Sequence, residues 1–385
     1  MNKDIHKILS TQFLTAFADN AVLFITITMA MQQLKIGAWY IPALQASFLV
    51  AYVVFAPWVG RLADVWPKRQ VMVVANLIKA LGAGLLLLNI EPILAYGIIG
   101  LGAAMYSPAK YGILPEVVDK NTLVKINGWV EGSTIFAILT GTLAGAMFAE
   151  YSIIGALISV IALYLSSAIF AQTIKHKHIV GHPSKNALSV FYTQTQSLLA
   201  SSTARFAILG VGMFWAAATV LRVLLIAWAP AILMLKSSTD IAGLTLFIAI
   251  GIAIGALLAP KLIPLTHLSR TSLAAYAMGI TIIILSLIDS LWGARLALLF
   301  TGICGGLFVV PINATLQEIG HQTMGAGGAV AIENFFNNFA MLIATGIYAI
   351  VAGANISPVT TMASLGVMVI ILMLIISRHK PKNND

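Results

Sequence analysis

The sequence predicts an all-α membrane protein with twelve transmembrane helices in two six-helix halves. Hydrophobic residues make up 59% of the 385 residues and charged residues only 9%, and the mean hydropathy is +0.95. Apolar windows of about 20 residues, the length that crosses a bilayer core about 30 Å thick, recur from end to end. One long polar stretch separates six such windows from six others. This composition excludes a soluble domain.

Each predicted helix is an apolar run of membrane-spanning length. In chain order the runs cover residues 8–31, 41–62, 70–89, 93–114, 125–148, 152–173, 206–234, 241–263, 271–289, 292–316, 326–352 and 357–377. The first run is too long for a signal-peptide core and no small-residue cleavage site follows it, so we expect it to be retained. Small residues recur every four positions in "GTLAGAMFA", residues 141–149, as close packing of two helices requires.

The polar stretch "KHKHIVGHPSKNALSVFYTQTQSLLASSTAR", residues 175–205, divides the chain. We expect an N-terminal half at residues 1–174, a cytoplasmic linker at 175–205 and a C-terminal half at 206–385. Apolar residues are interspersed with Ser, Thr and Gln from 187 to 199. This pattern fits either a short amphipathic helix at the membrane interface or an ordinary polar tether, and the sequence leaves both open.

Lysine and arginine residues lie mainly on one side of the predicted helices, which places both termini in the cytoplasm. That side holds Lys3, Lys7, Arg61, Lys68, Arg69, Lys120, Lys125, Lys175, Lys177, Lys185, Arg205, Lys261, Arg270, Arg378, Lys380 and Lys382, whereas the other holds Lys35 and Lys236, with Arg295 just inside a helix end. This asymmetry explains the net charge of +9, and no nucleic-acid partner is expected. The basic linker can contact anionic membrane lipids.

The sequence contains none of the common motifs of an enzyme. It has no phosphate-cradling glycine loop, no HExxH zinc motif and no recognisable Ser, His and acid arrangement, so we expect no enzymatic activity. The single Cys304 excludes an internal disulfide and a cysteine-built metal site, and we expect no metal or cofactor. A monomer is expected.

The two halves carry traces of an internal repeat at an offset of about 203 residues. "GAAMYSPAKYG", residues 102–112, aligns with "GGLFVVPINAT", residues 305–315. The pairs at this offset, to within one residue, are Pro108 with Pro311, Glu131 with Glu333, and Asp19 with Arg222. Such matches are typical of two parallel six-helix repeats around a central cavity. They predict that Asp19 and Arg222 offer opposite charges to that cavity.

The segment "GRLADVWPKR", residues 60–69, resembles the signature loop of the major facilitator superfamily. The resemblance implies that Gly60 permits close helix packing and that Asp64 caps the eleventh transmembrane helix near "GAGGA", residues 325–329, with Lys68 and Arg69 as the basic end. These residues would latch a cytoplasmic gate. The corresponding loop of the second half, "APKLIPLTHLSR", lacks the acidic residue.

Five further segments resemble the bacterial lysophospholipid transporter branch of this superfamily. They are "QFLTAFADNAVLF", "YSPAKYGILPE", "LVKINGWVEGSTI", "FWAAATVLRVLLIAW" and "VVPINATLQEIG". The resemblance implies inward flipping of lysophospholipids, chiefly lysophosphatidylethanolamine, across the bacterial inner membrane. It further implies re-acylation of the substrate by an acyltransferase with an acyl-carrier-protein synthetase. Two alternatives remain: a proton-coupled exporter of amphipathic drugs, or a subunit that recruits a lipid-modifying enzyme.

Six charged residues lie inside predicted helices and away from the obvious helix ends, where a charge is costly and tends to mark a functional site. They are Asp19, Lys79, Lys110, Glu131, Arg222 and Glu333. For a head group with a phosphate and an ammonium, Arg222 and Lys110 suit the phosphate, whereas Asp19 and Glu131 suit the ammonium. We expect Glu333 in the same substrate site.

Each of these residues also has a structural explanation. Asp19 and Arg222 fit a gate salt bridge, Lys79 fits a pair with a nearby acid, Lys110 fits an interfacial cation and Glu131 fits a gate or proton site. Asn20 fits an orienting partner of Asp19, a bridge between helices or a substrate contact. The polar run of Glu333, Asn334, Asn337 and Asn338 either lines the cavity or joins two helices.

Overall fold

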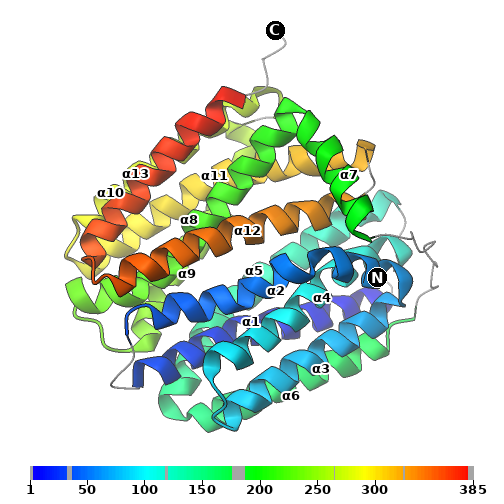
Figure 1. Cartoon of the computed structure of the whole chain (residues 1–385), viewed down its shortest axis with the longest axis horizontal. Coiled ribbons are helices and arrows are strands. Elements are labelled where there is room, and N and C mark those ends of the chain that lie inside the picture. Colours follow the sequence, from blue (N-terminus) through cyan, green and yellow to red (C-terminus); the bar gives the residue numbers. More distant parts are fainter. Residues whose placement is uncertain are drawn as a thin grey trace. The chain divides into compact units, whose positions relative to one another are not determined.

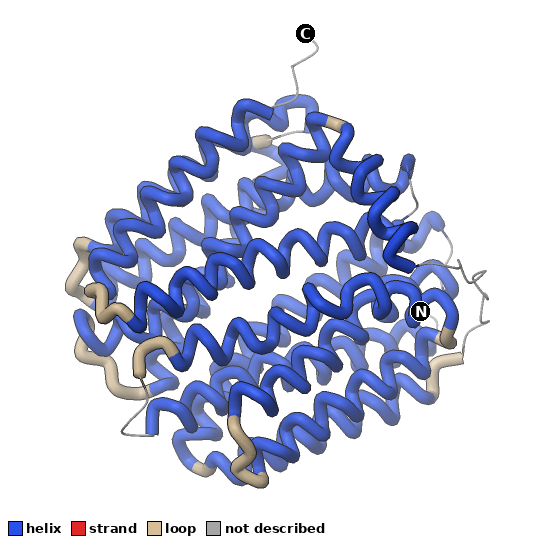
Figure 2. Tube along the Cα trace, in the orientation of Figure 1, coloured by secondary structure: helices blue, strands red, loops and turns tan. Residues whose placement is uncertain are grey.

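The computed structural model describes residues 3–32, 37–117, 120–175, 187–263, 265–323 and 326–379, and they are almost entirely helical (Figures 1 and 2). Within this described part, twelve helices are long and apolar enough to cross a membrane, which confirms the twelve predicted spans. Several helices are longer than their predicted spans; α11 (Leu291–Thr323), for example, continues past residue 316. A hydropathy window marks the bilayer crossing, whereas a helix can continue beyond it.

The chain forms two compact units. The first unit contains Met1–Ile36 and Ser47–Phe191. Its membrane helices are α1 (Lys3–Gln32), α2 (Tyr40–Val65), α3 (Lys68–Leu87), α4 (Pro92–Val117), α5 (Lys120–Tyr151) and α6 (Ile153–Gln172). The first residues of α2 group with the second unit, which contains Gly37–Ala46 and Tyr192–Asp385.

The second unit carries the other six membrane helices. These are α8 (Ser202–Ile232), α9 (Ser238–Leu262), α10 (Thr271–Ser286), α11, α12 (Ala326–Gly353) and α13 (Pro358–Ile376). Two short 3₁₀ segments, Leu265–Arg270 and Ser377–His379, precede α10 and follow α13. The segment for which the sequence left a helix and a tether open forms a helix, α7 (Ala187–Ala200).

In the first unit, α1 packs against α5 and α6, and α3 packs against α4 and α6. Glycines of α5 allow the close approach of α1. A Cβ on Gly145 would lie 2.5 Å from the Cα of Ala21, and one on Gly141 would lie 3.0 Å from the Cα of Phe17. This contact confirms that the small residues of "GTLAGAMFA" serve helix packing.

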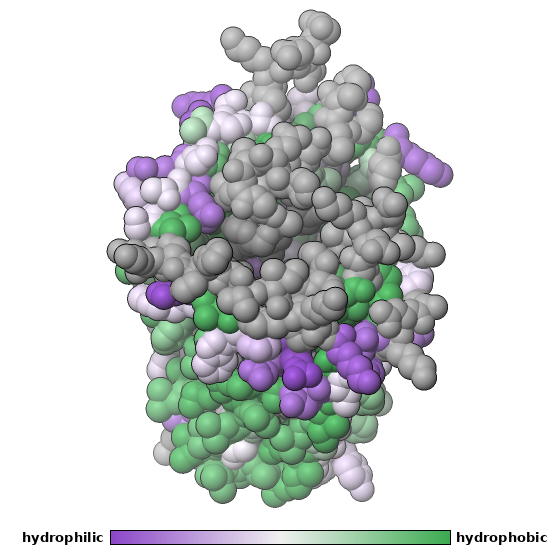
Figure 3. All heavy atoms as spheres, turned by 90° about the vertical axis from the view of Figure 1, so that its right-hand side faces the viewer, coloured by the Kyte–Doolittle hydropathy of each residue, from purple (hydrophilic) through white to green (hydrophobic). Residues whose placement is uncertain are grey.

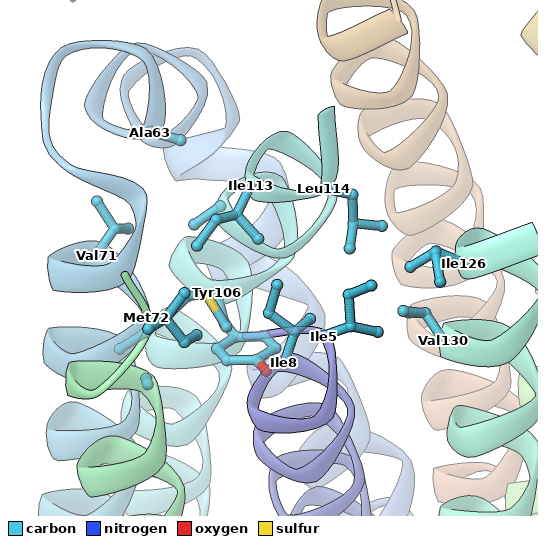
Figure 4. Close-up of a cluster of buried hydrophobic side chains, with 14 residues drawn as sticks. Ile5, Ile8, Ala63, Val71, Met72, Tyr106, Ile113, Leu114, Ile126 and Val130 are labelled. Carbon is cyan, nitrogen blue, oxygen red and sulfur yellow. The ribbon is translucent and has the colours of Figure 1, made fainter. Parts of the chain in front are cut away.

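Near one end of the first unit, fourteen buried residues form a cluster to which all six of its helices contribute (Figure 4). Ile5 and Ile8 of α1 extend toward side chains of α4 and α5, and Tyr106 lies between Ile8 and Met72. Between membrane helices, such contacts stabilise mainly through van der Waals packing, because lipid tails are as apolar as the side chains. The cluster holds the six helices together at the end where α1 begins.

In the second unit, α9 and α11 meet backbone to backbone at four glycines. A Cβ on Gly251 would lie 2.9 Å from the Cα of Gly302, and a Cβ on Gly255 would lie 3.0 Å from the Cα of Gly306. Interfaces of this kind need small residues, because only they let two helix backbones approach so closely. We call this contact the α9–α11 glycine interface.

The two units repeat the same helix pairs. In the first unit α1 packs with α5 and α6, and in the second unit α8 packs with α12 and α13. Likewise α3 packs with α4 and α6, and α10 packs with α11 and α13.

Large apolar side chains such as Leu257, Leu273 and Ile350 are exposed, as expected for helices surrounded by lipid. Figure 3 shows a continuous hydrophobic area next to hydrophilic side chains on one face.

Candidate functional site

An ion pair joins α1 to α3 inside the first unit. The Lys79 Nζ donates to Asp19 Oδ2 at 2.7 Å, and the Tyr164 hydroxyl of α6 donates to Asp19 Oδ1 at 2.9 Å. Lys79 is completely buried, whereas 22% of the Asp19 side chain is exposed. The carboxylate therefore has one hydrogen-bond donor on each oxygen and still presents part of its surface.

Aromatic rings and a glycine surround the Lys79 side chain. Its Nζ lies 4.9 Å from the centroid of the Tyr106 ring and 5.8 Å from that of Tyr164, within the range of cation–π attraction. Gly102 of α4 makes room for the side chain, because a Cβ there would lie 2.6 Å from Lys79 Cγ. The two tyrosine rings and the space left by Gly102 thus fix the position of the Lys79 ammonium opposite Asp19.

A second polar layer lies one helical turn away and joins the same three helices. Thr15 of α1 donates to Asn76 Oδ1 of α3 at 3.0 Å and lies 2.6 Å from the hydroxyl of Ser167 of α6. Asn76 Nδ2 donates to the Ser167 hydroxyl, which in turn donates to the carbonyl of Thr11. Buried polar groups inside a membrane must be satisfied by the protein, so these bonds tie α1, α3 and α6 into one body.

The corresponding positions of the second unit are apolar. The offset of 203 carries Thr15 to Ala218, Asn76 to Gly279, Lys79 to Ile282 and Ser167 to Ile370. A Cβ on Gly279 would lie 2.6 Å from the Ile370 side chain, so the two helices are in direct apolar contact there. Ala218 and Ile282 line a small cavity of about 20 Å³. The two repeats therefore place different chemistry at equivalent positions.

The side chains of two other predicted residues of the first unit contact groups on their own helices. Asn20 Nδ2 donates to the carbonyl of Ala16 on its own helix at 2.8 Å. Lys110 is 7% exposed, and its Nζ lies 4.0 Å from the centroid of the Tyr111 ring. Their roles in substrate binding stay predictions.

The signature loop is described in part. Lys68 is buried, with its Cε 2.7 Å from where a Cβ on Gly112 of α4 would stand, and Arg69 is half-buried. No described atom lies within 4 Å of a Cβ on Gly60. The side chains of Asp64 and Glu131 lie outside the described residues, so the predicted latch and the predicted role of Glu131 stay predictions.

In the second unit, Arg222 lies in the interior of α8 and Glu333 lies on α12, and both side chains are half-buried. The polar run after Glu333 continues with Asn337 and Asn338, which are 6% and 7% exposed. Asn338 donates to the carbonyl of Asn334 at 2.7 Å. The predicted meeting of Asp19 and Arg222 at one cavity stays a prediction.

An apolar groove lies on the first unit between α1, α5 and α6. It has a volume of about 580 Å³ and is lined by Leu9, Ser10, Phe13, Leu14, Trp129, Ser133, Phe136 and Phe170. The Phe13 and Phe136 rings stack with their centroids 5.8 Å apart. Among the described residues, no group of three or more His, Cys, Asp or Glu side chains could hold a metal ion.

The Asp19–Lys79 pair and the second polar layer together form a polar core of the first unit, made by Thr15, Asp19, Asn76, Lys79, Tyr164 and Ser167. The sequence did not predict that Thr15, Asn76, Tyr164 and Ser167 belong to it. Their spacing carried a signal, because each helix places its polar residues three or four positions apart. Thr15 and Asp19 are four apart, whereas Asn76 and Lys79, and Tyr164 and Ser167, are three apart. Residues with this spacing share one face of a helix.

A family model described as Major Facilitator Superfamily matches residues 8–345. The chain belongs to the major facilitator superfamily. Two superfamily relatives are the lysophospholipid transporter LplT of Klebsiella pneumoniae, 40% identical over 95% of this chain and 93% of the relative, and that of Photorhabdus laumondii, 38% identical over 96% and 93%. This similarity places the chain in the LplT branch of the superfamily.

Solved structures support the superfamily fold. The nucleoside transporter NupG has a TM-score of 0.73 at 13% identity and covers 98% of both chains. A bacterial homologue of the human lysosomal transporter Spinster has a TM-score of 0.72 at 12% identity with the same coverage. At these identities the likeness concerns the fold alone.

Gly102 gives a direct test of the Asp19–Lys79 geometry. Gly102→Ala is expected to lower transport activity, because the new methyl group would displace both the Lys79 side chain and the Ala75 carbonyl, which lies 2.6 Å from the Cβ position. Gly97→Ala on the same helix is the matched control, since its Cβ would lie 3.5 Å or more from its neighbours, an ordinary contact. Transport rate per folded protein measures the effect, and equal activity of the two variants would contradict it.

Proposed function

We propose that this protein moves lysophospholipids across the bacterial inner membrane toward the cytoplasm, with lysophosphatidylethanolamine as the main substrate. The observation that carries the proposal is the identity of 38 to 40% to lysophospholipid transporters over more than nine-tenths of the chain. The excess of Lys and Arg on one side of the helices supports cytoplasmic termini. Re-acylation by an acyltransferase with an acyl-carrier-protein synthetase would remove the substrate on that side.

The chemistry of the predicted site residues supports an amphiphilic substrate. A lysophosphatidylethanolamine head carries a phosphate and an ammonium, so a path through the membrane must offer partners of both signs. Asp19 presents part of a carboxylate, and Arg222 provides a planar group that can bind two phosphate oxygens. Lys110, Glu131, Glu333 and Asn20 are the further proposed contacts.

The apolar groove between α1, α5 and α6 suits the single acyl chain of a lysolipid. Phe13, Trp129, Phe136 and Phe170 offer aromatic surface along it. Keeping each CH₂ of the acyl chain away from water is worth about 0.8 kcal/mol, so a carrier must shelter the chain while the head group crosses.

We propose that Asp64, Lys68, Arg69 and Gly60 control the cytoplasmic gate during this movement. We also propose that the protein acts as a monomer.

Reconstitution tests the proposed function. Purified protein in vesicles should move labelled lysophosphatidylethanolamine between leaflets faster than protein-free vesicles, and the rate should be measured with and without a proton gradient. Extrusion of an amphipathic cation that depends on the proton gradient, without lysolipid movement, would favour the exporter instead. Lack of both activities would favour a subunit that recruits a lipid-modifying enzyme.

A further inference from the structure

The Asp19 carboxylate is already neutralised from inside its own unit. Lys79 and Tyr164 each donate to one of its oxygens, at 2.7 Å and 2.9 Å. An ionised carboxylate has about four acceptor positions, so roughly two remain for a ligand. Because 22% of the side chain is exposed, Asp19 can contact a head group without losing either donor.

Lys79 cannot exchange this partner for water. Its side chain is completely buried, Gly102 lies against its stem, and the Tyr106 and Tyr164 rings lie within 6 Å of its Nζ. An ammonium that left Asp19 would remain as an unpaired charge in a low-dielectric site, which is strongly unfavourable. Lys79 therefore acts as a fixed counter-ion of Asp19.

We propose that Lys79 is a positioning residue that sets head-group specificity, because its buried ammonium partly neutralises the Asp19 carboxylate and so weakens the attraction of that carboxylate for a head-group ammonium. This inference rests on the proposed function and deepens it. A bare carboxylate in a low-dielectric site would bind an ammonium tightly and release it slowly. With Lys79 in place, the carboxylate holds ammonium-bearing heads weakly enough to release them, and it does not demand an ammonium from every substrate.

The test compares two lysolipids with the same acyl chain, lysophosphatidylethanolamine and lysophosphatidylglycerol, of which only the first carries an ammonium. Their Kd values are measured with purified wild type and with Lys79→Met. A hydrogen bond to a charged group is worth about 1.5 to 3 kcal/mol, so the preference for the ethanolamine head should rise about tenfold or more in Lys79→Met. Its rate of ethanolamine-lysolipid transport should fall. Lys79→Arg keeps the cation and should return the preference to the wild-type value.

Two further variants keep the inference testable when Lys79→Met does not fold. Tyr164→Phe removes only the donor on Asp19 Oδ1 and should shift the preference in the same direction by a smaller factor. Ser167→Ala is the matched control, since it loosens the same three helices one turn away without touching Asp19. It should change the Kd of both lysolipids by the same factor.

The outcomes separate the inference from the proposed function. Wild type that binds and transports lysolipid, together with an unchanged preference in folded Lys79→Met or in Tyr164→Phe, would overturn the inference and leave the function standing. A loss of affinity by the same factor for both lysolipids would likewise assign Lys79 to the fold alone. Wild type that binds neither lysolipid would overturn the proposed function, and the inference with it.

Discussion

Replacing Arg222 with alanine is expected to abolish transport of lysolipids whichever head group they carry. Arg222 lies inside α8, a helix of 31 residues whose membrane span carries a mean hydropathy of 2.0. A guanidinium at such a position is costly and is retained where it binds an anion. The phosphate is common to all lysophospholipids, so loss of the Arg222 guanidinium should lower the transport of ethanolamine and glycerol heads alike.

The measurement is the initial transport rate of both lysolipids in vesicles. A charge-assisted hydrogen bond contributes about 1.5 to 3 kcal/mol, and loss of two such bonds should reduce the rate at least a hundredfold. Arg222→Lys keeps the charge without the planar fork and should retain a small part of the activity. Arg205→Ala on the same helix is the matched control and should retain transport, because Arg205 lies in the first turns of α8 and donates to the carbonyls of Leu199 and Ala200 at the end of α7. Normal transport by folded Arg222→Ala would show that the phosphate is bound elsewhere.

Gly251→Ala is expected to destabilise the second unit through the α9–α11 glycine interface. The new Cβ would overlap the Leu299 carbonyl and lie 2.9 Å from the backbone nitrogen of Ile303. Both neighbours are backbone atoms of a packed helix and cannot move aside without shifting the helix. Overpacking of this kind costs about 1 to 3 kcal/mol.

Gly243 on the same helix provides a control with the opposite expected sign. No described atom lies within 4 Å of a Cβ at Gly243, so alanine fits there. Alanine is better than glycine in a helix interior by up to about 1 kcal/mol, and Gly243→Ala should leave the melting temperature unchanged or raise it. The melting temperatures of the two variants in detergent are compared with wild type. A Gly251→Ala protein as stable as Gly243→Ala would mean that the backbones separate at little cost.

The membrane spans could be predicted because they depend on local composition. Every span is an apolar run, and a window of about 20 residues detects it without knowledge of the packing. The small residues of α5 could be interpreted in the same way, since a spacing of four places them on one helix face. Gly141 and Gly145 do meet α1.

The partner of Asp19 could not be predicted, because ion pairing depends on which helices are neighbours. The internal repeat directed attention to Arg222, whereas the described partners are Lys79 and Tyr164 of the same unit. A repeat alignment relates equivalent positions but does not state which side chains meet. The sequence predicted that Lys79 pairs with a nearby acid, which the structure confirms, but it did not show that this acid is Asp19 of α1.

The polar core also constrains how the protein is made. Asp19 enters the membrane first, and its partners Lys79 and Tyr164 follow 60 and 145 residues later in the chain. At a synthesis rate of about 5 to 20 residues per second, Lys79 emerges roughly 3 to 12 s after Asp19. During that interval an unpaired carboxylate in the bilayer centre costs about 2.5 to 3.5 kcal/mol. We therefore expect α1 to remain beside the insertion machinery until α3 arrives, so that α1 enters the lipid only when Lys79 can pair with Asp19.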